Sequence, residues 1–271
     1  MKCNVVCIQT SPLLYKKEEN LARMKELFIE AMNAYPNTDL VVFPELAATA
    51  YECGEAFQEL AEVAEKGSYS IDFLGALAKE YGVHVIFGMA ERDAEDPSTL
   101  YNSSVLLDDE GEVAGVYQKV HLFDGEKLWF TPGKEFKVFD TKIGRLGLFI
   151  CYDAFFPEAA RCMAVQGVDL LVNSTSWEKP YDWDMDMVMM ARALENTVYL
   201  ACCNRIGTDH TLSFFGHTRI LNQLGQVMTT VAEEAEGIIY ASLDYEKSEN
   251  MKKDYYTMLS ERRPELYGQL V

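Results

Sequence analysis

Apolar positions along the first two thirds of the chain alternate between a helical period and short continuous runs. Residues 17–34 place apolar side chains at helical spacing among strong helix formers. The run at 39–46 is apolar until it meets a proline, which is typical of a buried strand. The same reasoning predicts helices at 17–34, 55–66, 69–81, 156–167 and 184–197, and strands at 4–9, 39–46, 83–91, 168–177, 198–207, 237–243 and within 214–230.

Two further segments are each predicted to form a pair of strands joined by a short turn. Residues 100–122 surround a turn at 109–111, and residues 137–153 surround a turn at 142–144. Such hairpins place antiparallel neighbours in a sheet that the helical crossovers make partly parallel. Four apolar strands lack the period-2 alternation of a half-exposed sheet. The pattern therefore predicts a layered α/β sandwich, with helices outside two mixed sheets.

Composition narrows the classes of protein that remain. The chain has 271 residues, 49% of them hydrophobic, and no Ser/Gly-rich or Pro-rich linker divides it. We therefore expect one domain over 1–271, with a polar tail at about 245–271. The net charge of −19 disfavours nucleic acid and anionic membranes as partners. No signal sequence and no run of 18 apolar residues is present, so we expect a cytoplasmic protein.

Seven cysteines are present, and their spacing matches no metal motif such as CxxC. In a reducing compartment most cysteines are small apolar packing residues. Cys151 differs in position, because it follows the apolar strand RLGLFI and precedes a helix. A strand-to-helix turn of this kind exposes a nucleophile, and ligand sites of α/β sheets gather at strand ends.

Two other reactive residues also fall at strand ends. Glu45 follows DLVVFP, and Lys119 ends the second strand of the hairpin at 100–122. Each residue alone has an ordinary structural explanation. Glu45 could be a loop or cap carboxylate, Lys119 a solvated residue at a strand edge, and Cys151 a packed thiol. Together they supply a base, a cation and a nucleophile.

The segments that carry these residues resemble the nitrilase superfamily of carbon–nitrogen hydrolases. The resemblance covers essentially the whole chain in the family's order. It implies a Glu45–Lys119–Cys151 triad and a second glutamate at Glu126, although Asp124 and Glu135 are nearby acids. It also implies an αββα sandwich that dimerises to αββα–αββα, with the tail packed on the partner. The segments are VVFPELAATAY (41–51), GVYQKVHLF (115–123), GRLGLFICYDAFFPEAAR (144–161), LLVNSTSW (170–177), RALENTVYLACCNRIG (192–207) and RRPELY (262–267).

The chemistry of C–N hydrolysis suits these residue types. Glu45 would take the proton of the Cys151 thiol, return it to the leaving amine, and later activate water. Lys119 and the backbone N–H of Tyr152 would hold the oxyanion, and the cation should lower the pKa of Cys151. The reaction needs no cofactor and no metal.

Alternatives remain open at this stage. A Cys-His-Asp arrangement would use His121, which is two residues beyond Lys119, and a non-catalytic binding protein could share the fold. A metalloenzyme would need a ligand cluster, and none is apparent in the sequence.

The substrate is predicted only by class. Ala154, Phe155 and Phe156 offer no positive charge beside the nucleophile, so a substrate carboxylate is not favoured there. We expect a small linear amide or N-carbamoyl amine, with a nitrile as the alternative. The residues expected to bind it are Tyr51, Tyr152, Phe155, Ser176 and Trp177.

Overall fold

The computed structural model of the chain describes residues 1–270 and contains two six-stranded sheets and one two-stranded ribbon. The first sheet has the order β14 (Gly237–Asp244), β1 (Lys2–Gln9), β2 (Leu40–Val42), β3 (His84–Arg92), β4 (Leu100–Leu107) and β5 (Val113–Gln118). The second has the order β13 (Val227–Thr230), β12 (Arg219–Leu221), β9 (Tyr199–Asn204), β8 (Leu170–Thr175), β7 (Gly144–Ile150) and β6 (Val138–Thr141). The ribbon pairs β10 (Ile206–Thr208) with β11 (Ser213–Phe215).

Both sheets are mixed, as the hairpins predicted. The central pairs β1–β2, β2–β3, β7–β8 and β8–β9 are parallel, and the outer pairs are antiparallel. The hairpin of β4 and β5 lies within the segment 100–122 where the sequence places it. Parallel central strands align their carboxyl ends, which brings their following loops to one edge of each sheet.

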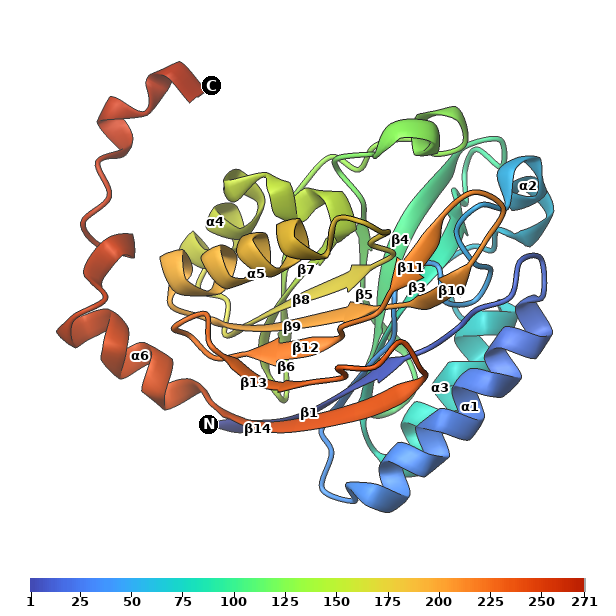
Figure 1. Cartoon of the computed structure of the whole chain (residues 1–271), viewed down its shortest axis with the longest axis horizontal. Helices are drawn as coiled ribbons and strands as arrows, with labels where there is room; N and C mark the ends of the chain where they lie inside the picture. The colour runs from blue at the N-terminus through green and yellow to red at the C-terminus, as the bar shows by residue number, and fades with distance from the viewer. Residues whose placement is uncertain (271) are drawn as a thin grey trace.

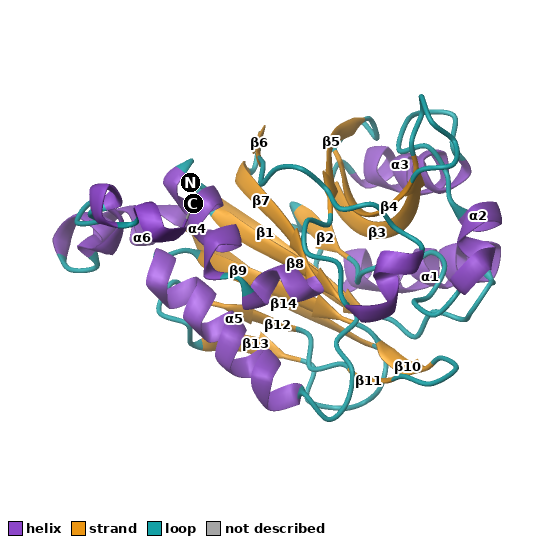
Figure 2. Cartoon of the chain, turned by 90° about the horizontal axis from the view of Figure 1, so that it is seen from above, coloured by secondary structure: helices purple, strands orange, loops and turns teal. Residues whose placement is uncertain are grey.

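Helices cover the outer face of each sheet, which gives the predicted αββα layers (Figures 1 and 2). Helices α1 (Lys17–Ala34) and α3 (Tyr69–Tyr81) pack on the first sheet, and α4 (Pro157–Val165) and α5 (Asp182–Asn196) pack on the second. Phe28 of α1, for example, is fully buried in one cluster with Val41 and Phe87. Burying a side chain of this size contributes about 1.5–3 kcal/mol.

The helix predicted at 55–66 is wrong in extent. Only a short 3₁₀ turn η1 (Gly54–Ala56) and α2 (Phe57–Leu60) form there. The backbone of Glu62 instead joins the end of β3, donating to Ala90 O at 3.2 Å and accepting from Arg92 N at 2.8 Å. Sheet pairing has thus replaced the helical hydrogen bonds of this segment.

Strand β2 is also shorter than the predicted run at 39–46. It ends before Pro44, which has no N–H to continue the ladder. The chain then turns across β3 at Gly88, where a Cβ atom would lie 2.7 Å from Glu45 Cα. Glycine at position 88 therefore allows the Glu45 segment to lie directly against the neighbouring strand.

The C-terminal segment follows β14 as α6 (Tyr245–Asp254) and three 3₁₀ turns: η4 (Thr257–Leu259), η5 (Pro264–Leu266) and η6 (Gly268–Leu270). Figure 1 shows it extending away from the sandwich and curving past the side where α4 and α5 lie. Its packing on a partner stays a prediction, and Val271 lies outside the described residues. Within residues 1–270, no helix is both long and apolar enough to span a bilayer.

Candidate active site

A buried ion cluster centred on Lys119 joins three of the predicted site residues. Lys119 follows β5 and its Nζ donates to Glu45 Oε1 at 2.7 Å and to Glu126 Oε1 at 2.6 Å. Glu126 lies in the 3₁₀ turn η2 (Asp124–Leu128), directly after the Lys119 segment. The Lys119 and Glu45 side chains are completely shielded from solvent. Such a charge cluster is stable in the interior only when its members are paired and hydrogen-bonded.

Hydrogen bonds fix both oxygens of Glu45. Oε2 accepts from the backbone N of Ser176 at 2.7 Å, and Oε1 accepts from Asn102 Nδ2 at 2.7 Å. Ser176 was expected to bind substrate, but it is buried and its Oγ donates to Glu45 O at 3.2 Å. Asn102 was not predicted. It begins a polar run, Asn-Ser-Ser, in the first half of β4, and its complete burial is apparent only in the structure.

Glu126 is distinguished from the neighbouring acids by its contacts. It accepts from Tyr51 OH at 2.6 Å and from the backbone N of Phe123 at 3.0 Å, in addition to Lys119. Glu135 instead pairs with Lys137 at 2.6 Å. The structure therefore places Glu126, as the resemblance implied, beside Lys119.

Cys151 begins the short 3₁₀ turn η3 (Cys151–Phe155) where β7 ends. Its φ is +43°, a left-handed conformation that costs a non-glycine residue about 1–2 kcal/mol. The backbone N–H of Tyr152 lies in the first turn of η3, where no intrahelical acceptor is available to it. The side chain of Cys151 is almost buried and lines a cavity.

The electrostatics of the cluster differ from the expectation for Cys151. Burial and the negative charge of Glu45 raise the pKa of Cys151 well above its usual value, although Lys119 acts to lower it. Burial opposes the charge of Lys119, but Glu126 and Glu45 outweigh it, so the pKa of Lys119 is raised. Burial also raises the pKa of Glu126, and Lys119 offsets part of that effect. The raised pKa favours the thiol form of Cys151, and a thiol would need a base before it could attack.

The cavity at Cys151 has a volume of about 490 Å³ and is mainly aromatic. Three predicted substrate contacts line it: Tyr152, Phe155 and Trp177, the last two with ring centroids 5.0 Å apart. Its charged lining residues are Glu178 and Asp184, and burial raises the pKa of Glu178. Within residues 1–270, no lysine, arginine or histidine lines this cavity.

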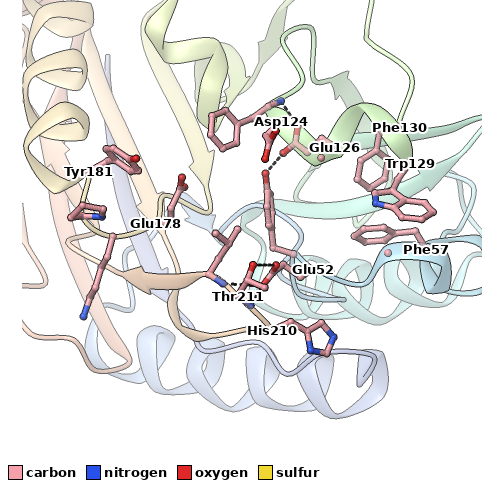
Figure 3. Close-up of a pocket in the computed structure, with 17 residues that line it drawn as sticks. Glu52, Phe57, Asp124, Glu126, Trp129, Phe130, Glu178, Tyr181, His210 and Thr211 are labelled. Carbon is pink, nitrogen blue, oxygen red and sulfur yellow. Dashed lines mark hydrogen bonds between the residues drawn. The ribbon is translucent and has the colours of Figure 1, made fainter.

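A second cavity of about 610 Å³ adjoins the first, because Phe123, Glu178 and Tyr181 line both. Figure 3 shows Trp129 and Phe130 gathered at one end of it and Tyr181 at the other. Tyr51, the remaining predicted contact apart from Ser176, lines this larger cavity together with Glu126.

His121 does not form the contact that a Cys-His-Asp arrangement requires. Its Nδ1 lies 2.8 Å from Asp153 Oδ1, and its ring stacks on Phe156 with centroids 3.6 Å apart. In the part of the chain that the structure describes, no hydrogen bond joins His121 to Cys151, and no group of three or more His, Cys, Asp or Glu residues could hold a metal ion.

Comparisons with known proteins find relatives along nearly the whole chain. A model of the carbon–nitrogen hydrolase family matches residues 4–253. A Schizosaccharomyces pombe protein named "Probable nitrilase" is 42% identical over 271 residues, with 100% of this chain and 99% of the relative covered. N-carbamoylputrescine amidase from Solanum tuberosum is 33% identical, covering 86% of this chain and 84% of the relative. The crystal structure of a carbon–nitrogen hydrolase from Helicobacter pylori G27 has a TM-score of 0.89 at 28% identity, covering 100% of this chain and 98% of that one.

Proposed function

Because the chain belongs to the carbon–nitrogen hydrolase family, we propose that it hydrolyses a small linear amide or N-carbamoyl amine through a thioester on Cys151. The observation that carries this proposal is the Glu45–Lys119–Glu126 cluster, whose charges act on the thiol of Cys151. Together with Cys151, the cluster would supply a base, a cation and a nucleophile in one buried site, each with a distinct task.

In the first half of the reaction, Glu45 takes the proton of the Cys151 thiol while the sulfur attacks the carbonyl carbon. The C–N bond then breaks, Glu45 passes the proton to the departing nitrogen, and ammonia leaves a thioester behind. In the second half, Glu45 accepts a proton from water as the water attacks the thioester. The acid is released and the proton returns to the sulfur; for an N-carbamoyl amine the Cys151 adduct is a thiocarbamate and the acid is a carbamic acid, which breaks down to CO₂ and the amine.

Lys119 suits the oxyanion that forms in both halves. An ammonium has three N–H donors, and Glu45 and Glu126 use two of them. In residues 1–270 no further acceptor contacts Nζ, so the third N–H is left for the carbonyl oxygen, with Tyr152 N–H as a second donor. One such donor contributes about 2.7–4 kcal/mol to lowering the barrier.

Glu126 acts on Lys119 rather than on the substrate in this scheme. Its Oε1 accepts from Lys119 and Tyr51 OH, and its Oε2 accepts from Phe123 N, so every contact holds it in one orientation. Asn102 Nδ2, which reaches Glu45 at 2.7 Å, ties the same pair of carboxylates together from the other side.

The cavity at Cys151 supports a neutral or cationic substrate. Aromatic side chains and two acids line it, so a substrate carboxylate would meet negative charge without a cation to pair with. The similarity to an N-carbamoylputrescine amidase favours the same class, since that relative's name describes an amine-bearing carbamoyl compound.

A nitrile is the second candidate, and the specific observation for it is the 42% identity to the "Probable nitrilase". The same thiol would add to the nitrile carbon, and two water molecules would then be consumed to give acid and ammonia. The triad serves both reactions, so the substrate must be distinguished by assay.

The test is ammonia release from the full chain across four substrate groups: short linear amides, N-carbamoyl amines, N-carbamoyl amino acids and nitriles. We expect amides or N-carbamoyl amines to be turned over fastest, with N-carbamoyl amino acids poor because of their carboxylate. Turnover confined to nitriles would favour the second candidate. No release from any group would contradict the proposal.

A further inference from the structure

Asp153 is a completely buried carboxylate that the reaction scheme does not use. Its two oxygens accept four hydrogen bonds: from Ile150 N at 3.0 Å, Tyr117 OH at 2.8 Å, and His121 N and Nδ1 at 2.8 Å each. Among residues 1–270 no lysine or arginine pairs with it. Burying a carboxylate away from water costs free energy. The four hydrogen-bond donors offset that cost for Asp153, which has no lysine or arginine partner within the described part of the chain.

The four donors lie on either side of the two reacting residues. Ile150 immediately precedes Cys151, and Asp153 follows it by two residues, so their hydrogen bond closes a ring around the nucleophile. Tyr117 and His121 stand two residues before and two residues after Lys119. The Asp153 carboxylate therefore binds residues on both sides of Lys119 in sequence and the residue directly before Cys151.

These contacts also cross between the two sheets. Tyr117 belongs to β5 of the first sheet, and Ile150 ends β7 of the second. The side chains of Cys151 and Lys119 consequently have no shared strand to set their separation. The left-handed φ of Cys151 adds to the need for an anchor, because such a conformation persists only where surrounding contacts impose it.

We propose that Asp153 is a positioning residue that sets Cys151 against Lys119 by binding both flanking segments. This inference rests on the proposed function for the roles of the two residues. It gives His121 a task as well, since its imidazole serves as one of the donors to Asp153 and not as a base for the thiol. A misplacement of about 1 Å between reacting groups costs on the order of 100-fold in rate.

The first test is Asp153→Asn in the full chain. Asparagine keeps the shape but replaces one acceptor oxygen with a donor, so it cannot accept from all four groups. On the best substrate of the ammonia screen we expect kcat to fall about 100-fold with KM changed less than about threefold. Asp169→Asn is the matched control. Asp169 also accepts a hydrogen bond from a backbone N–H of β7, that of Arg145 at 2.8 Å, but it does not line the cavity at Cys151.

The second test separates placement from folding and does not depend on amide turnover. In a Cys162→Ala background, Cys151 is acylated by p-nitrophenyl acetate, which forms an oxyanion, or capped by methyl methanethiosulfonate, which does not. We expect Asp153→Asn to slow acylation at least tenfold more than capping. An equal fall in both rates would assign Asp153 to folding alone and overturn the proposal.

Tyr117→Phe is the milder variant, because it removes one donor and keeps the ring. We expect Tyr117→Phe to lower the ratio of the acylation rate to the capping rate by less than Asp153→Asn does. This variant can therefore test the proposal even if Asp153→Asn does not fold. Wild-type kcat and ratio in both variants would overturn the proposal. If the wild type hydrolyses no amide, nitrile or carbamoyl compound, the proposed function fails, whereas the rate ratio still decides the role of Asp153.

Discussion

Glu45 and Ser176 meet across the two sheets, where the backbone N of Ser176 donates to Glu45 Oε2 at 2.7 Å. Glu45 follows β2 of the first sheet, and Ser176 follows β8 of the second. With Oε1 bound to Lys119, the carboxylate has one orientation only. The proposed base is thus oriented by packing of the whole sandwich and not by its own loop.

Replacing Glu45 by glutamine should remove the base and keep the side-chain volume and the hydrogen bond to Ser176 N, while the amide nitrogen cannot accept from Lys119 Nζ as Oε1 does. The amide oxygen can still accept from Ser176 N, but it cannot take a proton from the thiol. We expect kcat for ammonia release to fall about 10²–10⁴-fold. Glu91→Gln is the control, since Glu91 is a partly buried carboxylate bonded to Gln118 outside both cavities, and it should retain full activity. A Glu45→Gln enzyme with more than a tenth of wild-type kcat would exclude Glu45 as the base.

Thiol labelling should single out Cys151 once one competitor is removed. Cys162 is exposed, whereas the other five cysteines are buried in the core. In Cys162→Ala, we expect one equivalent of iodoacetamide to react at Cys151, and a saturating amide substrate to slow that reaction. Mass mapping of the modified peptide is the measurement. Cys151→Ala in the same background should neither react nor release ammonia, and labelling spread over several cysteines would count against the proposed nucleophile.

Removing the cation should destabilise the protein as well as inactivate it. Lys119→Met leaves Glu45 and Glu126 buried without their partner, so we expect a loss of about 3–5 kcal/mol in the free energy of unfolding. Adding Glu126→Gln removes one of the uncompensated charges and should recover part of the loss. Urea unfolding measures both variants. The control is Lys142→Met, whose exposed pair with Asp109 should contribute less than about 1 kcal/mol. Equal stability of Lys119→Met and wild type would contradict the expected electrostatics.

The raised pKa of Cys151 predicts a stability that falls in alkali. An unfolded thiol releases its proton near pH 8.5, about its ordinary pKa, while the folded thiol keeps it. Above that pH the folded state binds more protons than the unfolded state, so stability declines as pH rises, by up to about 1.4 kcal/mol per pH unit. Cys151→Ser lacks this titration and should decline less steeply between about pH 8.5 and 10. Parallel stability curves for the two proteins would show that the pKa is not raised.

The dimer that the family resemblance implies is tested by a charge on α5. Met187, Met190 and Leu194 are exposed apolar side chains of α5, and the C-terminal segment curves past the side of the sandwich where this helix lies (Figure 1). We expect wild type to elute as a dimer by light scattering and Met187→Glu to shift towards monomer. Leu128→Glu, a change at an exposed leucine in η2, should leave the mass unchanged. A wild-type protein that elutes as a monomer would contradict the expected dimer.

The order of elements and the positions of the candidate site residues at strand ends could be predicted because both leave local signals. Glu45, Lys119 and Cys151 each follow a strand, and the structure brings the first two into direct contact. The helix at 55–66 could not be judged locally, because the competing partner of Glu62 lies in β3, about 30 residues away. Long-range pairing of this kind overrides the local preference for a helix.

The residues that support the candidate site were harder to predict than Glu45, Lys119 and Cys151. Asn102 lies inside a strand, and Asp153 lies in a turn, where a polar residue is unremarkable. Their importance follows from contacts 57 and 36 residues away in sequence, to Glu45 and Tyr117. The effect of burial on Cys151 was missed for the same reason, since the sequence shows the neighbouring cation but not the depth of the thiol.

Strand β14 closes the edge of the first sheet by pairing with β1 along its full length, from Gly237–Gln9 to Asp244–Lys2. The sheet that carries Glu45 and Lys119 is therefore incomplete until the ribosome has made residue 244. A chain that ended before β14 would contain Glu45, Lys119 and Cys151 without the complete first sheet. Recovery of activity on refolding should consequently require the first and last strands of the described chain, β1 and β14, to pair with each other.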